Sequence, residues 1–462
     1  MYIRKVNIEN IRSIDRFQMA FPEGKEAGWH VLIGDNGAGK STIIRSAALA
    51  MLDVADVNAA RQNWNDWLQT GQRIGNIDVV VVPDSRYDST TGPVQNRITF
   101  EGKLVRDEEG NILIPDSQAS LLEIIFRGRK VYGKQIEASP MTMAPVYTDV
   151  APAPAPNPSQ SIETKLGVWF SVAYGPFRRF TGGNADKDSL FISNPHLGAH
   201  LSAFGEDVAL TEALTYLEVL YIRSLELFIN GKVQDQTFDQ LKQFINQADL
   251  LPHGAVLEDI SLSAGMLFRD GNGFLVDAIQ MSDGYRSVLS MTIELIRQLI
   301  RSYGPDLVFA NVRNGGKTID LPGVVLIDEI DAHLHPTWQT RIGQWFTKYF
   351  PNLQFIVTTH SPLVCRAAEK GSIWRLAAPG SDQVSGEVTG VERDRLVFGN
   401  VLDAYGTEVF GQNVERSEHS KNKLQQLAHL SQLNAYGQIS DDQKKELQEL
   451  RKILITDDTT EF

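Results

Sequence analysis

The chain has 462 residues, of which 42% are hydrophobic and 22% are charged, as in an ordinary globular protein. Acidic residues outnumber basic residues by 57 to 44 and the net charge is −13, which argues against a chain that coats nucleic acid over its whole surface. A single cysteine, an opening unlike a signal peptide and the lack of an apolar run of about 18 residues argue against a secreted or membrane protein and favour the cytoplasm.

Hydrophobic periodicity predicts that strands and helices alternate along the chain. Strands are expected at residues 2–8, 13–20, 29–33, 77–82, 168–174, 324–327 and 353–358. Helices are expected at residues 43–52, 210–229, 238–247, 284–302, 413–436 and 441–453. Between residues 256 and 276, two strands joined by a turn at 270–273 are expected.

Two segments interrupt this pattern. Residues 88–116 are polar and contain glycine, which predicts a β-rich excursion with loops. Residues 150–160 are rich in proline and alanine, which predicts an extended, solvated connector. Near the end of the chain, Ser440 and Gln443 predict a capping box for the last helix.

A glycine-rich segment follows the strand at 29–33. Residues 34–41 read GDNGAGKS and fit G-x-x-x-x-G-K-[ST] between an apolar strand and a helix, a context that weighs against an ordinary glycine turn. The glycines let backbone N–H groups surround phosphate oxygens at the positive end of the helix. Lys40 is expected to reach the β- and γ-phosphates of ATP, and the Ser41 hydroxyl to bind Mg²⁺. The nucleotide-binding residues predicted in this segment are Asn36, Gly37, Ala38, Gly39, Lys40, Ser41 and Thr42.

Two adjacent acids end the apolar strand at 324–327. Adjacent side chains at a strand end point in different directions, so Asp328 is expected to face the Mg²⁺ shell and Glu329 the attacking water. Glu329 is therefore the predicted general base of phosphoryl transfer to water. Two solvated acids at the start of a loop are the competing interpretation, which the apolar strand disfavours.

Histidines occur at two places after Asp328 and Glu329. His360 follows the strand at 353–358 and is predicted to sense the γ-phosphate by hydrogen bonding. His333 and His335 could suggest a metal site, but no further ligand is spaced to complete one. We interpret them as structural parts of a loop near a dimer partner.

Residues 281–287 read MSDGYRS and stand before the predicted helix at 284–302. They resemble the ABC signature, in which a serine and a glycine at a helix N-terminus bind the γ-phosphate of the ATP held by the other subunit. The resemblance implies that Ser282 and Gly284 act in trans. Met281 stands where leucine is common, which is a mild departure.

The order of the motifs is that of an ABC-type ATPase head: phosphate loop, signature, acidic pair, Asp331 loop and His360. Residues 10–13 read NIRS and are similar to the Asn-Phe-Arg-Ser opening of the SMC, RecF and OLD-type ATPases. This resemblance implies that Arg12 contacts the nucleotide and that ATP and Mg²⁺ are the cofactors.

Three further segments resemble PtuA, the ATPase of Septu anti-phage systems, which is typically paired with an HNH nuclease. They are LIDEIDAHLHP (326–336), TTHSP (358–362) and AYGPFRR (173–179). One family feature, the glutamine of the Q-loop, is not assigned. Gln69 and Gln72 lie before a strand, and the other plausible place, 174–179, has no glutamine.

The resemblance implies an α/β fold, namely an ABC-type ATPase head of the P-loop NTPase class with a mixed sheet and flanking helices. We expect the first part of the head at residues 1–199 and its second part at 256–375. A helical insertion is expected at 200–255 and a helical C-terminal region at 376–462.

No nuclease motif is found in the chain. After His360 there is no Asp-x-Asp pair of the TOPRIM type, and the tail offers only His419 and His429 where an HNH site needs clustered histidines. We therefore expect that any cutting is done by a partner. The tail helices either bind that partner or another copy, or only cover the head, through Leu424, Leu427, Leu430, Leu447, Leu450 and Leu454.

Basic clusters occur at residues 127–130 and at Arg178 and Arg179. A solvated face is the favoured interpretation, and DNA contact is the alternative. Arg178 or Arg179 could instead contact the nucleotide.

These observations predict an ATPase that forms a head-to-head dimer or a higher homo-oligomer. Its nucleotide state is expected to regulate a partner HNH nuclease that acts on DNA in an anti-phage defence complex. DNA contact by this chain itself stays open, and no membrane contact is expected. The alternatives are a RecF- or SMC-like DNA repair ATPase without a nuclease partner, and a transporter subunit, which residues 10–13 disfavour.

Overall fold

The computed structural model describes residues 1–52, 56–57, 66–84, 86–88, 98–106, 112–113, 170–176, 194–205, 211–230, 236–248, 250–251, 254–261, 265–381, 383–401, 404 and 418–453. Contacts divide the chain into two compact units, residues 1–397 and 398–462. The predicted boundaries at 199, 255 and 375 stay predictions, because the contacts separate the chain only at residue 397.

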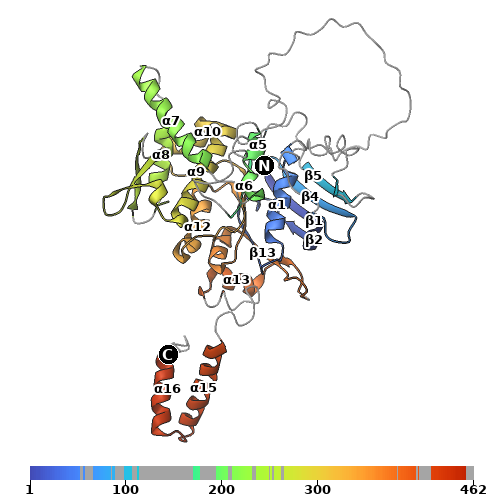
Figure 1. The fold of residues 1–462 in the computed structure, drawn as a ribbon, viewed down its shortest axis with the longest axis vertical. Coiled ribbons are helices and arrows are strands. Elements are labelled where there is room, and N and C mark those ends of the chain that lie inside the picture. The colour runs from blue at the N-terminus through green and yellow to red at the C-terminus, as the bar shows by residue number, and fades with distance from the viewer. Residues whose placement is uncertain are drawn as a thin grey trace, which may run out of the picture. The chain divides into compact units, whose positions relative to one another are not determined.

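A six-stranded sheet in the order β14-β13-β3-β12-β11-β7 organises the first unit (Figure 1). Neighbouring strands from β13 to β7 are parallel, and β14 is antiparallel to β13. Both faces of the sheet are covered, which explains why the strands β11 and β12 are fully buried. The bounds are β3 Gly28–Gly34, β7 Ser171–Tyr174, β11 Gly323–Ile327, β12 Leu353–Thr358, β13 Gly371–Leu376 and β14 Gly386–Glu387. The predicted α/β fold with a mixed sheet is confirmed.

Helices cover this sheet from two sides (Figure 1). The contacts of α1 are with β3, β7, β11 and β12, while α12 and the 3-10 helix η5 pack against β3. On the α12 side, Trp29 of β3 stacks on Phe346 at 6.3 Å between ring centroids and lies 5.4 Å from Phe355. The bounds are α1 Lys40–Ala50, α12 Pro336–Tyr349 and η5 Pro362–Lys370. Cys365 of η5 is fully buried, and this burial raises the pKa of its thiol.

A second sheet, antiparallel and in the order β2-β1-β4-β5-β6, packs on the other side of α1. Its strands are β1 Tyr2–Ile11, β2 Ile14–Ala20, β4 Ile74–Val82, β5 Ile98–Arg106 and β6 Ile112–Leu113. Buried and exposed side chains alternate along β4, as expected for a strand with one covered face. Strands within the predicted excursion at 88–116 confirm its β-rich character for the described residues. The predicted connector at 150–160 lies outside the described residues.

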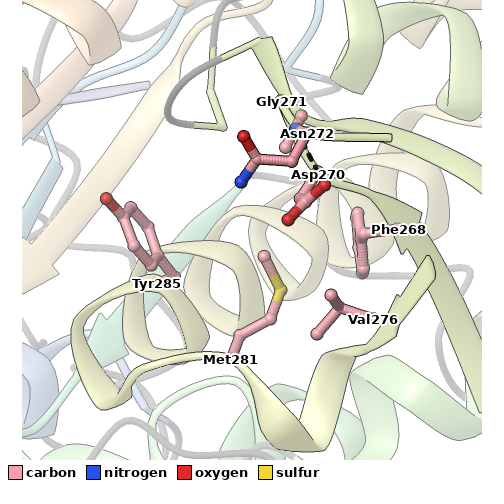
Figure 2. A pocket seen from close by; sticks show the side chains of 8 residues that line it. Phe268, Asp270, Gly271, Asn272, Val276, Met281 and Tyr285 are labelled. Atoms are coloured by element: carbon pink, nitrogen blue, oxygen red, sulfur yellow. Dashed lines mark hydrogen bonds between the residues drawn. The ribbon is translucent and has the colours of Figure 1, made fainter. Parts of the chain in front are cut away.

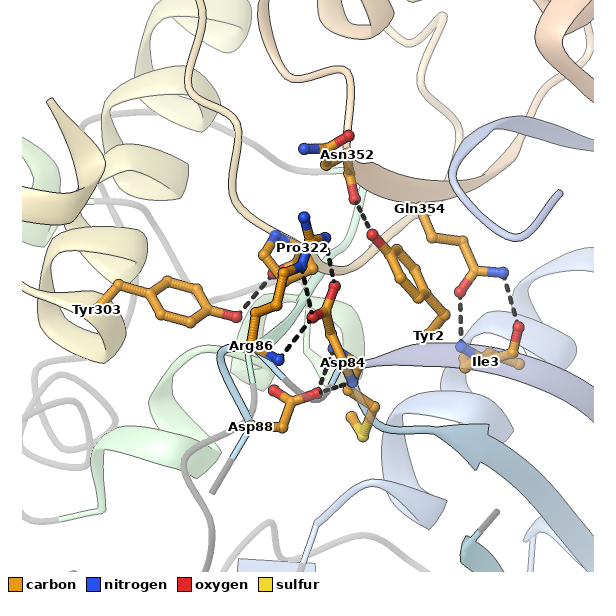
Figure 3. Close-up of polar contacts among 10 residues, drawn as sticks. Tyr2, Ile3, Asp84, Arg86, Asp88, Tyr303, Pro322, Asn352 and Gln354 are labelled. Atoms are coloured by element: carbon orange, nitrogen blue, oxygen red, sulfur yellow. Dashed lines mark hydrogen bonds and ion pairs between the residues drawn. The ribbon is translucent and has the colours of Figure 1, made fainter. Parts of the chain in front are cut away.

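Polar contacts fasten the start of β1 to the parallel sheet (Figure 3). The Gln354 side chain accepts a hydrogen bond from the Ile3 N–H at 2.6 Å and donates one to the Ile3 carbonyl at 2.9 Å. The Tyr2 hydroxyl donates to the Asn352 carbonyl at 2.9 Å. These contacts lie at the beginning of β12, so they fix the two sheets at the end remote from the carboxyl ends of the strands.

A helical and β-rich segment joins β7 to β11. It contains α5 Pro195–Gly198, α6 Leu201–Phe204, α7 Thr211–Ile229, α8 Thr237–Gln247, β8 Val256–Ser261, β9 Gly265–Arg269, β10 Leu275–Asp277, η4 Ala278–Gln280, α9 Asp283–Tyr303, α10 Pro305–Val308 and α11 Ala310–Arg313. The prediction of two strands between 256 and 276 is wrong, because three antiparallel strands form there. Two strands, β8 and β9, form where the first strand was expected, and β9 begins at Gly265. The sequence analysis recognised only the turn at 270–273. The small residues Ser263, Ala264 and Gly265 were the available turn signal.

The second unit is a helical hairpin of α15 Glu418–Ala435 and α16 Asp441–Ile453. Leu430, Leu447 and Leu450 form its buried core, and Leu424 and Leu427 pack against them. The leucines predicted to bind a partner or cover the head therefore pack against each other, apart from Leu454, which lies outside the described residues.

The predicted capping box begins α16 as expected. The Gln443 N–H donates to the Ser440 hydroxyl at 3.3 Å, and the Ser440 N–H donates to the Gln443 side chain at 2.9 Å. In the first unit, the remaining helix is α13 Gly390–Phe398. None of the described helices is both long enough and apolar enough to cross a membrane.

Gly343 of α12 provides a test of this packing. A Cβ at Gly343 would lie 2.5 Å from the Ala367 Cβ and 2.6 Å from the Trp29 ring. We expect Gly343→Ala to lower the free energy of unfolding by about 1–2 kcal/mol, because an overpacking cost of about 1–3 kcal/mol exceeds the gain in helix propensity. Urea unfolding measures this change. Gly386→Ala is the matched control, since a Cβ there meets nothing within 4 Å, and an unchanged or more stable Gly343→Ala protein would contradict the prediction.

Candidate nucleotide site

The predicted phosphate loop lies between the end of β3 and the start of α1. Gly37 and Gly39 have φ of 79° and 97°, in the left-handed region that side chains avoid. Gly39 is the N-cap of α1, whose first residues are Lys40, Ser41 and Thr42. The loop therefore places the N-terminal end of an 11-residue helix at the carboxyl end of β3, as a phosphate site requires.

Lys40 is buried with only 6% of its surface exposed. Its ammonium donates to the Gly34 carbonyl at 2.7 Å and to the Asp35 carbonyl at 3.0 Å. Burial lowers the pKa of Lys40, while Asp328 and nearby carboxylates oppose this shift. A buried ammonium held by loop carbonyls is a cation that an anionic ligand in the loop would stabilise.

Asp328 and Glu329 follow β11, and they lie at the same edge of the sheet as the loop because β3, β12 and β11 are parallel neighbours. Asp328 is 1% exposed, and its carboxylate accepts a hydrogen bond from the Thr358 hydroxyl at 2.6 Å. The Glu329 N–H donates to the same hydroxyl at 2.7 Å. Glu329 itself has a φ of 47°, which is unusual for a residue with a side chain.

Thr359, the residue after β12, stabilises the turn that follows the acidic pair. Thr359 donates from its hydroxyl to the Asp331 carboxylate at 2.6 Å. The His360 N–H lies 3.4 Å from both oxygens of that carboxylate. The His360 side chain is exposed, and His360 follows the end of β12 that contacts the acidic turn.

The signature segment begins α9. Ser282 is the N-cap residue, and its side chain makes no capping hydrogen bond to the helix. A Cβ at Gly284 would lie 2.8 Å from the His333 carbonyl, so the glycine lets α9 approach the loop after the acidic pair closely. Asp283 and Arg286 form an ion pair on the first turn. The backbone at His333 therefore packs against the start of α9 within this chain. No described group of three or more His, Cys, Asp or Glu is arranged to hold a metal ion.

A pocket of about 510 Å³ adjoins the signature segment (Figure 2). Met281 and Tyr285 form its α9 side, and Phe268 and Val276 its apolar side on the small sheet. The Asp270 carboxylate at its rim accepts the N–H groups of the turn, which shapes the loop above the pocket. The pocket is lined by Ala255, Phe268, Asp270, Gly271, Asn272, Val276, Met281 and Tyr285.

The turn between β1 and β2 brings Arg12 beside the phosphate loop. A Cβ at Gly39 would lie 2.8 Å from Ile14 and 3.2 Å from the Ser13 hydroxyl. The Arg12 guanidinium lies 4.7 Å from the Trp67 ring centroid. The backbone N–H of Arg12 donates to the Trp67 carbonyl at 2.8 Å. Trp67 was missed by sequence reasoning, because nothing in the sequence pairs it with residues 10–13.

A second arginine, Arg45 of α1, lies close enough to Arg12 to affect its pKa. Burial, and then the charge of Arg45 on α1, lower the pKa of Arg12. Among the described residues, the buried atoms without a hydrogen-bond partner include the Nε atoms of Arg12 and Arg45. Two half-buried arginines whose buried Nε donors are unpaired, beside a phosphate loop, are suited to an anion. Arg45 lies one helical turn after Ser41, a spacing from which it could have been recognised.

Backbone strain is concentrated around these elements. The described non-glycine residues with positive φ are Asn10, Arg12, Glu329 and His333, with φ between 47° and 64°. Two lie in the turn beside the phosphate loop, and two lie in the acidic turn. Strained conformations persist where surrounding contacts fix them, and they gather at functional sites.

The described donors suit a magnesium ion. Ser41 offers a hydroxyl and Asp328 a carboxylate, and Mg²⁺ prefers such oxygen ligands together with phosphate and water. Other expected residues are not placed. Arg178, Arg179 and residues 127–130 lie outside the described residues, as does the segment after Pro176 where a Q-loop would follow β7.

Two family models match the chain. The model described as "AAA domain" matches residues 5–138. The model described as "AAA domain, putative AbiEii toxin, Type IV TA system" matches residues 190–366. The matched regions include the phosphate loop and the segment from α7 to the acidic turn.

The curated proteins that are similar to the chain include two retron ATPases and a Septu protein. The retron Ec83 probable ATPase of Escherichia coli is 41% identical over 81% of this chain and 71% of its own length. The retron Vc95 probable ATPase of Vibrio cholerae serotype O1 biovar El Tor is 25% identical over 78% of this chain and 71% of its own. The Septu protein PtuA of Bacillus mycoides (strain KBAB4) is 24% identical over 80% of this chain but only 40% of its own length.

Gly39 provides a test of the loop geometry. Gly39→Ala would place a Cβ at a φ of 97° and 2.8 Å from Ile14, so we expect nucleotide binding to fall at least about tenfold, the factor that a cost of about 1.4 kcal/mol produces. Titration with a fluorescent ATP analogue measures this loss. Gly24→Ala is the control, because Gly24 also has a positive φ but its Cβ meets nothing within 4 Å. Wild-type affinity in Gly39→Ala would refute the assigned loop.

Proposed function

We propose, from the premise that this chain belongs to the family of the Escherichia coli retron Ec83 probable ATPase, that it is the nucleotide-gated ATPase subunit of a defence complex. It is an ABC-type ATPase of the SMC and RecF class, and its relatives are ATPases of the retron and Septu defence systems. The observation that supports the finer proposal most is the shared sheet edge, where the phosphate loop, the acidic pair and His360 meet.

Each residue of the site has a separate proposed role in ATP hydrolysis. The N–H groups of residues 36–42 and the Lys40 ammonium bind the phosphates, with the Arg12 guanidinium beside the loop. Ser41 and Asp328 would hold Mg²⁺, which would supply positive charge at the site. Glu329 accepts the proton of the attacking water, and His360 donates a hydrogen bond toward the γ-phosphate.

Each complete site is proposed to need two copies of the chain. Ser282 and Gly284 begin α9, so the helix can present its N-terminal N–H groups and the Ser282 hydroxyl to the γ-phosphate held by the other copy. Bound ATP then stabilises the closed dimer or a higher homo-oligomer, because it contacts both copies only in that state. Hydrolysis removes this differential affinity and releases the dimer.

The gated activity is proposed to be an HNH nuclease on a separate chain that acts on DNA. The resemblance to the Septu ATPase supports this partner. The nuclease responds to nucleotide because the closed and open dimers offer it different surfaces. A repair ATPase of the RecF kind, without a nuclease partner, is the alternative.

Mixing two inactive variants tests the shared sites. Lys40→Ala removes the phosphate-binding ammonium and Ser282→Arg blocks the signature, so each pure variant is expected to lose ATPase activity. An equimolar mixture forms heterodimers with one intact site each, and we expect about a quarter of wild-type activity, because half of the dimers are mixed and each has one of two sites. Phosphate release measures this rate. If the mixture stays as inactive as either variant alone, the sites are not shared.

A second test concerns the partner. Glu329→Gln is expected to bind ATP without hydrolysing it and so to hold the closed dimer, whereas Lys40→Ala cannot reach that state. Both tagged variants are purified from the native host with Mg²⁺ and ATP, and the bound proteins are identified by mass spectrometry. We expect a stoichiometric nuclease whose amount differs between the two variants. Recovery of replication or repair proteins with both variants would favour the RecF-like alternative, and an equal amount of nuclease on both would exclude gating through the dimer.

A further inference from the structure

Thr358 is a polar residue at the end of β12, a fully buried strand. Every residue of β12 is buried, and Thr358 has no exposed surface. A buried hydroxyl costs free energy unless it is hydrogen-bonded, so its partners show what it stabilises. Neither the predicted motifs nor the proposed chemistry assigns this residue a role.

The Thr358 hydroxyl joins the two acids that the proposed function uses. A hydroxyl has one hydrogen to donate and two lone pairs that accept. Thr358 donates its hydrogen to the Asp328 carboxylate at 2.6 Å and accepts the Glu329 N–H at 2.7 Å. One side chain from β12 therefore orients the proposed Mg²⁺ ligand and the backbone of the proposed general base.

The backbone of Thr358 adds a further contact. Its carbonyl accepts the Ile330 N–H at 3.0 Å, so Thr358 holds three consecutive residues of the acidic turn. Glu329 lies in the middle of them, at the strained φ of 47°. Such a conformation costs about 1–3 kcal/mol and persists only where contacts on both sides determine it. Thr358 supplies one such contact to each of Asp328, Glu329 and Ile330.

We infer that Thr358 is a positioning residue for ATP hydrolysis, which acts by fixing the Asp328 carboxylate and the Glu329 backbone. The inference rests on the proposed function of the site. It also links the acids to His360, because Thr358 and Thr359 precede His360 and both donate to the turn that carries the acids. A displacement of the β12 end would move all of these groups together.

A purely structural role makes a different prediction. Valine has the shape of threonine and is as suited to a buried strand, so Thr358→Val would keep the packing of β12. It would also remove the hydroxyl that donates to the Asp328 carboxylate and accepts the Glu329 N–H. Thr358→Ser keeps the hydroxyl and loses only a methyl group. The two variants therefore separate hydrogen bonding from packing.

The experiment compares Thr358→Val, Thr358→Ser and the wild type as full chains. Thr292→Val is the matched control, because Thr292 is equally buried and donates only to the Val288 carbonyl within α9. Steady-state ATP hydrolysis gives kcat and KM. Binding of a fluorescent ATP analogue is measured without Mg²⁺, in a chelator, and over a range of Mg²⁺ concentrations.

For Thr358→Val we expect kcat to fall roughly ten- to hundredfold, the factor that follows from losing one hydrogen bond to a charged group. The Mg²⁺ concentration for half-maximal tightening of nucleotide binding should rise, while binding in the chelator stays unchanged. Thr358→Ser should recover most of kcat, and Thr292→Val should match the wild type.

Wild-type kcat and Mg²⁺ dependence in Thr358→Val would overturn the inference, and so would a Thr358→Ser protein as impaired as Thr358→Val. These outcomes leave the proposed function intact as long as Lys40→Ala abolishes nucleotide binding. If the wild type does not bind the analogue at all, the proposed function fails and this inference fails with it.

Discussion

The parallel alignment of β3, β12 and β11 is the constraint on which the candidate site depends. Parallel strands end at one edge, so groups from distant parts of the chain meet there: the phosphate loop, Asp328 with Glu329, and His360. The fastening of β1 by Gln354 acts at the opposite edge and leaves this one open to a ligand. Helices cover both faces of the sheet, which is why the strands β11 and β12 are fully buried.

The site carries costs that the surrounding core must offset. Lys40 is a buried cation, and Glu329 and Arg12 adopt backbone conformations that favour glycine. Burial of apolar surface around α1 and between the two sheets supplies the compensating free energy. A bound anion would lower the free-energy cost of burying the cationic groups of Lys40 and Arg12. Such a site is more stable with its ligand than without it.

Sequence reasoning can predict where residues lie when their positions are set by local pattern. The loop glycines, Lys40 and the acidic pair each lie directly after an apolar strand, so their place at a strand end could be predicted. Trp67 and Thr358 could not be found, because their importance comes from partners far away in sequence. Thr358 in particular is compatible with an ordinary buried strand until Asp328 is seen beside it. The division of 256–276 into three strands was missed because small residues near Gly265 mark a turn only weakly.

Cys365 lies on η5, the segment that follows His360, and its side chain is fully buried with a raised thiol pKa. The thiolate is the form that oxidants and electrophiles attack, so both low access and a high pKa protect this sulfur. The chain has no other cysteine. Oxidising or reducing conditions therefore leave the covalent structure next to His360 unchanged, and the turnover of this ATPase should be insensitive to the thiol redox state of its surroundings.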